Sequence, residues 1–113
     1  MVKSIVMHLK AKKCRPCSGE EEALKGDEIQ VLYRQLEDGW EVVDDKKIRK
    51  KFLFDNFRES MAFAQKIAAV AEEEDHHPDL YIHYTNVEVE LSTHKIGGLS
   101  ENDFILAAKI DNL

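Results

Sequence analysis

Three histidines in the C-terminal half of the chain lie beside expected turns, where side chains from different elements can converge. His76 and His77 are adjacent and directly precede Pro78, His94 follows the last expected strand, and Asp103 opens the last expected helix. An unperturbed imidazole has a pKa of about 6.5, so histidines can donate and accept protons near neutral pH. The group therefore predicts either acid–base chemistry or metal binding.

Each of these residues also has an ordinary structural explanation. A histidine at the C-terminal end of a helix often complements the helix dipole, and Asp103 resembles the acidic member of a capping box. Three histidines and a carboxylate could bind zinc. Adjacent helical residues point about 100° apart, however, so His76 and His77 are poorly placed to share one ion but can surround a flat organic ring. We therefore predict an organic substrate and no metal, and structural roles for His8 and His83.

The two cysteines, Cys14 and Cys17, form a Cys-x-x-Cys turn near the N-terminus. Two thiolates supply half of a structural zinc site. A redox motif of this kind normally lies at a strand-to-helix junction of a βαβ unit, and the sequence predicts none here. A turn with two free thiols is the preferred interpretation, with zinc binding and redox chemistry as alternatives.

Composition argues against several classes of function. A chain of 113 residues that are 43% hydrophobic is expected to form one domain. The net charge of −6 argues against direct binding of nucleic acid. No apolar stretch approaches the roughly 18 residues of a membrane span, and residues 4–9 are too short for the core of a signal peptide. We expect a cytoplasmic protein without nucleic-acid or membrane partners.

Hydrophobic periodicity predicts the elements that position the candidate residues. Helices are predicted over 27–36, 56–75 and 100–112, and strands over 40–43, 48–54, 80–84 and 87–93. Asp55 is the predicted N-cap of the second helix. Residues 1–23 are predicted to form an N-terminal arm that contains the Cys-x-x-Cys turn and at most one short strand. Residues 24–113 are predicted to form the folded domain.

The order of these elements, α-β-β-α-β-β-α, predicts an α+β fold. In the last strand Val87, Val89 and Leu91 alternate with Glu88 and Glu90. This alternation is typical of a sheet that is covered on one side only. We therefore expect a four-stranded antiparallel sheet with three helices packed on one face.

A long gapped pattern links the candidate site residues. Glu72 is followed after three residues by His76-His77-Pro78, then after five by Tyr84, after nine by His94 and after eight by Asp103. This pattern resembles the signature of the pterin-4a-carbinolamine dehydratases, whose animal members also act as dimerisation cofactors of a homeodomain transcription factor. The flanking segments 39–40, 52–57, 91–94 and 98–100 are similar to the family as well, and the resemblance covers about residues 24–113.

The resemblance implies an activity and residue roles. The implied reaction is dehydration of a 4a-hydroxytetrahydropterin to the quinonoid dihydropterin in tetrahydrobiopterin recycling, without a cofactor. The implied site residues are His76, His77 and His94 as catalytic groups and Glu72, Pro78 and Asp103 as substrate-binding or orienting groups. The family also implies a homodimer or homotetramer, formed by joining sheet edges and packing helices.

This dehydration needs an acid for the 4a-hydroxyl and a base for the proton on N5, both active near pH 7. Glu72 lies four residues before His76, and a carboxylate or a helix C-terminus favours imidazolium. We hypothesise that His76 or His77 is the acid and that His94 is a second acid–base group or a pterin ligand. Two alternatives stay open: a protein-interaction module that acts as a transcription-factor dimerisation cofactor, and a dehydratase-like protein of molybdopterin metabolism.

Overall fold

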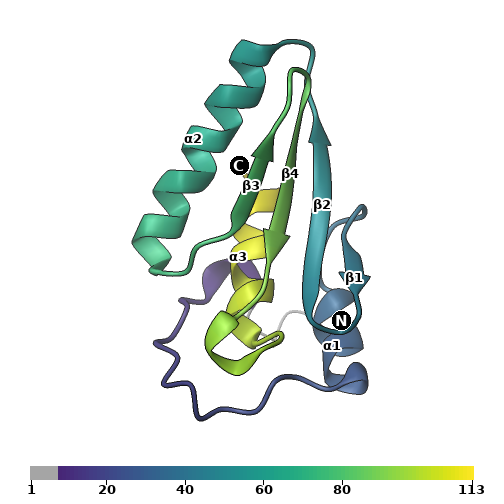
Figure 1. The fold of residues 1–113 in the computed structure, drawn as a ribbon, viewed down its shortest axis with the longest axis vertical. Coiled ribbons are helices and arrows are strands. Elements are labelled where there is room, and N and C mark those ends of the chain that lie inside the picture. Colours follow the sequence, from purple (N-terminus) through teal and green to yellow (C-terminus); the bar gives the residue numbers. More distant parts are fainter. Residues whose placement is uncertain (1–7) are drawn as a thin grey trace.

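The structure, a computed structural model, describes residues 8–113 (Figure 1). Its elements are the short 3-10 helix η2 (Leu9–Ala11), α1 (Gly26–Tyr33), β1 (Glu41–Val43), β2 (Lys47–Leu53), α2 (Phe57–Glu74), β3 (Asp79–Ile82), β4 (Asn86–Leu91), the 3-10 helix η3 (His94–Ile96) and α3 (Glu101–Asp111). The predicted α+β class and the order α-β-β-α-β-β-α are confirmed. Each strand lies within two residues of its predicted limits.

The four strands form one antiparallel sheet in the order β1-β2-β4-β3. Ile48 pairs with Leu91, and both side chains are completely buried. On the opposite face Arg49 pairs with Glu90, and its guanidinium makes an ion pair with the same glutamate. In β4 the apolar residues therefore face the helices and the glutamates face outward, as the alternation predicted, whereas Lys50 of β2 lies on the helix side and makes an ion pair with α3.

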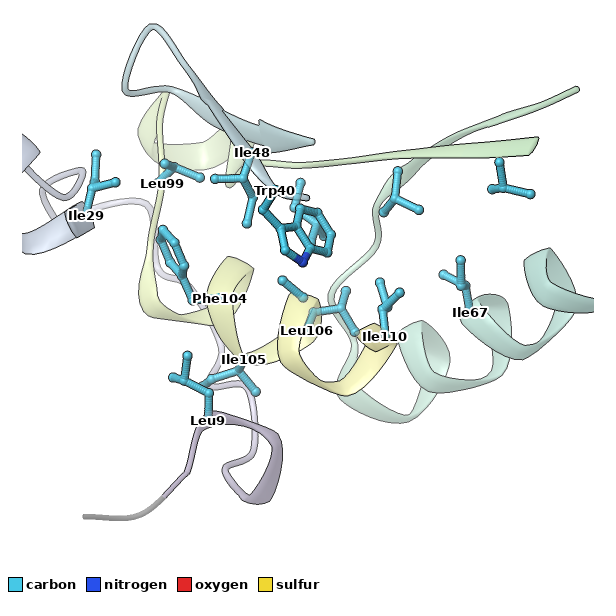
Figure 2. Close-up of a cluster of buried hydrophobic side chains, with 14 residues drawn as sticks. Leu9, Ile29, Trp40, Ile48, Ile67, Leu99, Phe104, Ile105, Leu106 and Ile110 are labelled. Carbon is cyan, nitrogen blue, oxygen red and sulfur yellow. The ribbon is translucent and has the colours of Figure 1, made fainter. Parts of the chain in front are cut away.

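The core lies between this sheet and the helices (Figure 2). Trp40 precedes β1 and, like Ile48, points towards Leu106 of α3, while Ile67 is the completely buried large side chain of α2. Leu9 of the arm is also buried and lies beside α3. Burial of these large side chains fixes the helices on the sheet, each contributing about 1.5–3 kcal/mol relative to an exposed side chain.

The start of α2 differs by one residue from the prediction. Asp55 was predicted as the N-cap, but the side-chain oxygen of Asn56 accepts the hydrogen bond from the Glu59 N–H at 2.9 Å. Asn56 also has the extended backbone that an N-cap requires. The Glu59 carboxylate in turn accepts from the Asp55 N–H at 3.1 Å. The prediction of Asp55 was wrong because Asn56, one position later, is the residue that accepts from the Glu59 N–H.

The first helix is shorter than the apolar stripe suggested. Helix α1 ends at Tyr33, after which the Gln35 and Leu36 N–H groups bond three residues back, in a tight turn. The Tyr33 hydroxyl donates to the Trp40 carbonyl at 2.7 Å and so fixes this turn against the start of β1. Leu36 still packs against the core, which explains why it fitted the helical stripe.

The described part of the arm, residues 8–23, contains η2 and no strand. The remainder of the predicted arm, residues 1–7, lies outside the described residues. Within residues 8–113, no helix is both long enough and apolar enough to cross a membrane.

Candidate active site

The turn after α2 determines where the two adjacent histidines point. Asp75 adopts a left-handed conformation with φ of 52°, and the His76 N–H bonds back to the Ala71 carbonyl at 3.2 Å. The chain therefore leaves the helix before His76, and Pro78 prevents the helix from resuming. The side chain of His76 is only 12% exposed, whereas that of His77 is 53% exposed.

His76 is paired with a completely buried carboxylate. Its Nε2 lies 2.6 Å from Oδ1 of Asp103. The other oxygen of Asp103 accepts from the Thr93 hydroxyl at 2.8 Å and from the Ser100 N–H at 2.9 Å. The second of these bonds is the carboxylate half of the predicted capping box. Asp103 is thus held by the start of α3 and by the segment after β4, and it fixes the orientation of the His76 ring.

His77 has a carboxylate partner of its own. Its Nε2 lies 2.6 Å from Oε2 of Glu72, and both side chains are exposed. The sequence placed Glu72 one helical turn before His76, but Glu72 contacts His77 instead. The physical reason is the left-handed Asp75, which ends the helix before the turn that would align Glu72 with His76.

His94 joins the other two histidines at one cavity. It begins η3, and its loop is held by a 2.7 Å bond from the Thr93 N–H to the Gly98 carbonyl. A cavity of about 490 Å³ is lined by all three of His76, His77 and His94. Residues from the end of α2 and from the segment after β4 are therefore brought together.

The other predicted site residues, Glu72, Pro78 and Asp103, lie beside the residues of this cavity and do not line it. Asp103 is behind His76, and Glu72 is bonded to His77. Pro78 follows the histidine pair in the turn. Tyr84, the aromatic residue of the pattern, is exposed in the loop between β3 and β4.

The proton transfers that the site can perform depend on which imidazole nitrogens are already hydrogen-bonded to a carboxylate. Carboxylates accept hydrogen bonds, so a neutral His76 or His77 carries its proton on Nε2 and keeps a lone pair on Nδ1. Within residues 8–113, the Nδ1 atoms of these two rings have no hydrogen-bond partner. The arrangement can therefore exchange protons with a ligand through Nδ1, while Nε2 and its carboxylate hold each ring in place.

The sequence did not predict that the N-terminal arm contributes to this cavity. Residues 13–17 line it together with the histidines. The Cys14 N–H donates to Oε1 of Glu74 at 2.8 Å. Burial, together with the nearby Glu74 carboxylate, raises the pKa of the Cys14 thiol to about 12. Cys14 is consequently a neutral thiol at physiological pH, and the Cys-x-x-Cys turn was the only signal that pointed to this segment.

The carboxylate next to Cys14 is buried and ionised. Burial alone would raise the pKa of Glu74, but the Cys14 N–H and Lys109 outweigh it and hold the pKa below its usual value. Both cysteines are free thiols. Within residues 8–113, no three His, Cys, Asp or Glu side chains are grouped as the ligands of a metal ion would be.

Comparison with known proteins gives consistent matches over nearly the whole chain. Residues 22–113 match the family "Pterin 4 alpha carbinolamine dehydratase". A protein of Rubrobacter xylanophilus, named as a candidate pterin-4-alpha-carbinolamine dehydratase, is 48% identical over 105 residues, which are 93% of this chain and 97% of that protein. A protein of Nitrosospira multiformis with the same name is 51% identical over 105 residues, 93% of this chain and 91% of that protein.

A solved structure is similar as well. The crystal structure of a transcriptional coactivator/pterin dehydratase from Brucella melitensis superposes with a TM-score of 0.75 at 35% sequence identity. The match covers 80% of this chain and 97% of that one.

Proposed function

Because the chain belongs to the pterin-4a-carbinolamine dehydratase family, we propose that it dehydrates a 4a-hydroxytetrahydropterin to the quinonoid dihydropterin. Family membership confirms the resemblance drawn from the spacing of the candidate residues. The observation that supports this activity most directly is the single cavity lined by His76, His77 and His94. A flat heterocycle in that cavity would meet imidazoles from two separate segments of the chain.

The reaction needs two proton transfers from and to the protein, one to the hydroxyl group on C4a and one from the adjacent N5. The C4a–O bond breaks as an acid protonates the hydroxyl, which leaves as water. The lone pair of N5 forms the C4a=N5 double bond, and a base then removes the proton from N5. Positioned acid–base groups typically accelerate such steps about 10²- to 10⁴-fold. The substrate and the imidazoles supply every proton and electron pair that this sequence requires.

The contacts of the three histidines suggest which of them acts in each proton-transfer step. Asp103 holds Nε2 of His76, so an imidazolium at His76 would protonate the 4a-hydroxyl through Nδ1 and be left neutral, with its remaining proton on Nε2. The pair of His77 and Glu72 is similar but exposed, which makes His77 the alternative acid. His94 has no carboxylate partner within residues 8–113. We assign it the second acid–base step or a bond to the pterin.

We further propose that the protein acts in the cytoplasm, in tetrahydrobiopterin recycling, as a homodimer or homotetramer. Strand β3 is an outer strand of the sheet, and Tyr81 and Ile82 on it are exposed. An unpaired strand edge with exposed apolar residues is suited to pairing with a second chain. The similar Brucella melitensis protein is described as a transcriptional coactivator as well as a pterin dehydratase, so a protein-interaction function is the second candidate.

The proposed activity can be tested with synthetic 4a-carbinolamine, followed by the absorbance of the quinonoid product. Alanine replacements of His76, His77 and His94 are compared with His83→Ala, which removes an exposed histidine that pairs with Glu88 outside the cavity. We expect kcat to fall about 10²-fold or more for the residues that transfer protons and to stay near wild type for His83→Ala. A wild-type protein without activity would reject the proposal, and a site variant with normal kcat would remove that histidine from the mechanism.

A further inference from the structure

Residues 13–17 of the arm line the histidine cavity, and Figure 1 shows the course of the arm. In the figure the arm, drawn in purple to dark blue, curves round the loop that carries η3 and passes below the C-terminal end of α2. We propose that this segment, which we term the arm wall, contacts the 6-substituent of the bound pterin and sets the affinity for it, and that Asn102 is the residue that positions the wall. The identity of the ligand rests on the proposed function.

Asn102 forms hydrogen bonds with both backbone polar groups of one residue in the arm wall, Arg15. Its side-chain oxygen accepts from the Arg15 N–H at 2.9 Å, and its side-chain nitrogen donates to the Arg15 carbonyl at 2.6 Å. The Asn102 carbonyl also accepts from the Cys14 thiol at 3.6 Å. Asn102 directly precedes Asp103, so the residue that holds the wall is adjacent to the residue that holds His76.

A second attachment joins the wall to the end of α2. Glu74, whose side chain is only 3% exposed, accepts from the Cys14 N–H and makes ion pairs with Lys109 at 3.1 Å and Lys13 at 3.7 Å. A buried carboxylate with several partners has little freedom to move. Because Glu74 lies two residues before His76, the wall and this histidine share one support.

A third attachment lies at the other end of the wall. The Lys95 ammonium donates to the Cys17 carbonyl at 3.1 Å, and Lys95 follows His94 directly. Pro16, between the attached residues, has a fixed φ, which restricts the backbone of the segment. The wall is thus tied both to the turn that carries His76 and to the loop that carries His94.

The chemistry of the substrate explains why a wall at this place would meet the substituent. C6 of the pterin is bonded to N5, the atom that loses a proton, so any group on C6 extends from the edge at which the histidines act. The wall presents the exposed side chains of Lys13 and Arg15 beside those histidines, and each cation has N–H groups beyond those in its ion pair with Glu74 or Glu101. Such donors suit a hydroxylated substituent, whereas a methyl group offers them no hydrogen-bond partner.

The kinetic test uses Asn102→Ala, with Asn112→Ala as the matched control at the other end of α3. Two carbinolamines are compared, one with a 6-dihydroxypropyl group and one with a 6-methyl group. For Asn102→Ala we expect KM to rise about tenfold for the first and less than about twofold for the second, with kcat nearly unchanged for both. The control should match wild type. An unchanged KM for both substrates, or an equal rise for both, would overturn the proposal.

Two single-cysteine proteins give readouts that do not depend on turnover. In the Cys17→Ser protein, the rate at which Cys14 is alkylated reports whether the wall is packed in place. Adding Asn102→Ala to this protein should increase that rate several-fold. Unchanged labelling would overturn the assigned role of Asn102. In the Cys14→Ser protein, 7,8-dihydrobiopterin should slow the alkylation of Cys17, which also lines the cavity.

These readouts separate this inference from the proposed function. If wild type turned over neither carbinolamine, the proposed function would fail, and the labelling of Cys17 would decide the inference by itself. Protection by 7,8-dihydrobiopterin would support contact with the wall, and its absence would overturn it. If turnover were normal but Asn102→Ala released Cys14 without affecting KM, the function would stand and the inference would be rejected.

Discussion

Asp103 and His76 are 27 positions apart in the chain, and Oδ1 of the first lies 2.6 Å from Nε2 of the second. The carboxylate is completely buried and also holds Thr93 and Ser100. A histidine whose orientation depends on a buried carboxylate loses its correct tautomer when that carboxylate becomes an amide. This relationship allows the orientation of the ring to be tested separately from the presence of the ring.

Asp103→Asn should lower kcat about 10- to 1000-fold, because the amide no longer fixes the proton on Nε2 of His76. Thr93→Val is the control, since it removes a hydroxyl from the same carboxylate and leaves the His76 contact in place. Both variants should lose about 1–3 kcal/mol of stability through an unsatisfied buried group. Turnover and urea unfolding are measured together, and a folded Asp103→Asn protein with full kcat would contradict the assignment.

The loop that carries His94 should respond differently to two neighbouring glycine replacements. A Cβ on Gly98 would lie 2.8 Å from the Cβ of Ala23, so the backbone must shift. Gly97 has a φ of +65°, and beyond its two chain neighbours no described residue has an atom within 4 Å of the position of its Cβ. Gly97→Ala should therefore cost about 1 kcal/mol from backbone strain alone.

Gly98→Ala should cost about 1–3 kcal/mol through overpacking and should also lower kcat/KM, because Gly98 anchors Thr93 before His94. Urea midpoints and kinetics of the two variants are compared. Equal losses of activity for Gly97→Ala and Gly98→Ala would show that the anchor does not control the site.

Cys14 should make stability depend on pH in the alkaline range. Burial raises the pKa of its thiol from 9.0 to about 12 in the folded protein. A raised folded pKa contributes stability that is fully present below the unfolded pKa and is lost as pH rises towards the folded pKa. Between pH 9 and 12 wild type should therefore lose more stability than Cys14→Ser, measured as the urea midpoint. Cys17→Ser, which retains Cys14, should follow wild type, and identical curves for all three proteins would contradict this expectation.

The outer edge of β3 should mediate association of chains. Light scattering of wild type should give a mass of two or four chains, and Ile82→Lys should shift it towards one chain because a charge on a paired edge is unfavourable. Val31→Lys is the control, since Val31 is another exposed apolar residue but lies on α1. A wild-type monomer, or an unchanged mass for Ile82→Lys, would reject pairing through β3.

The features of the fold that depend on local periodicity were predictable from the sequence. The alternation from Val87 to Leu91 correctly indicated a strand with one buried face, because successive side chains point to opposite sides of a sheet. The limits of α1 and the cap of α2 were less accurate. The cap of α2 depends on which of two neighbouring polar residues accepts from the Glu59 N–H, and the end of α1 depends on a tight turn that is fixed by the contact of Tyr33 with Trp40.

The sequence indicated which residues to consider as candidates for the site but not how they are paired. The histidines and both acidic residues were identified from their spacing, yet Glu72 was aligned with the wrong histidine because a single left-handed residue, Asp75, changes the direction of the chain. The arm wall was missed for another reason. Its contact with Asn102 joins positions 87 residues apart, and no local pattern encodes such a contact.

The dyad of His76 and Asp103 also has a consequence for synthesis of the protein. Asp103 lies in the last helix, so on the ribosome His76 is added to the growing chain 27 positions before the carboxylate that orients it. An incomplete chain accordingly has the imidazoles but lacks the carboxylate beside His76, so the proton transfer proposed for this residue requires docking of the C-terminal helix. Translation products that stop before this helix should be inert towards the substrate, even though every histidine is present.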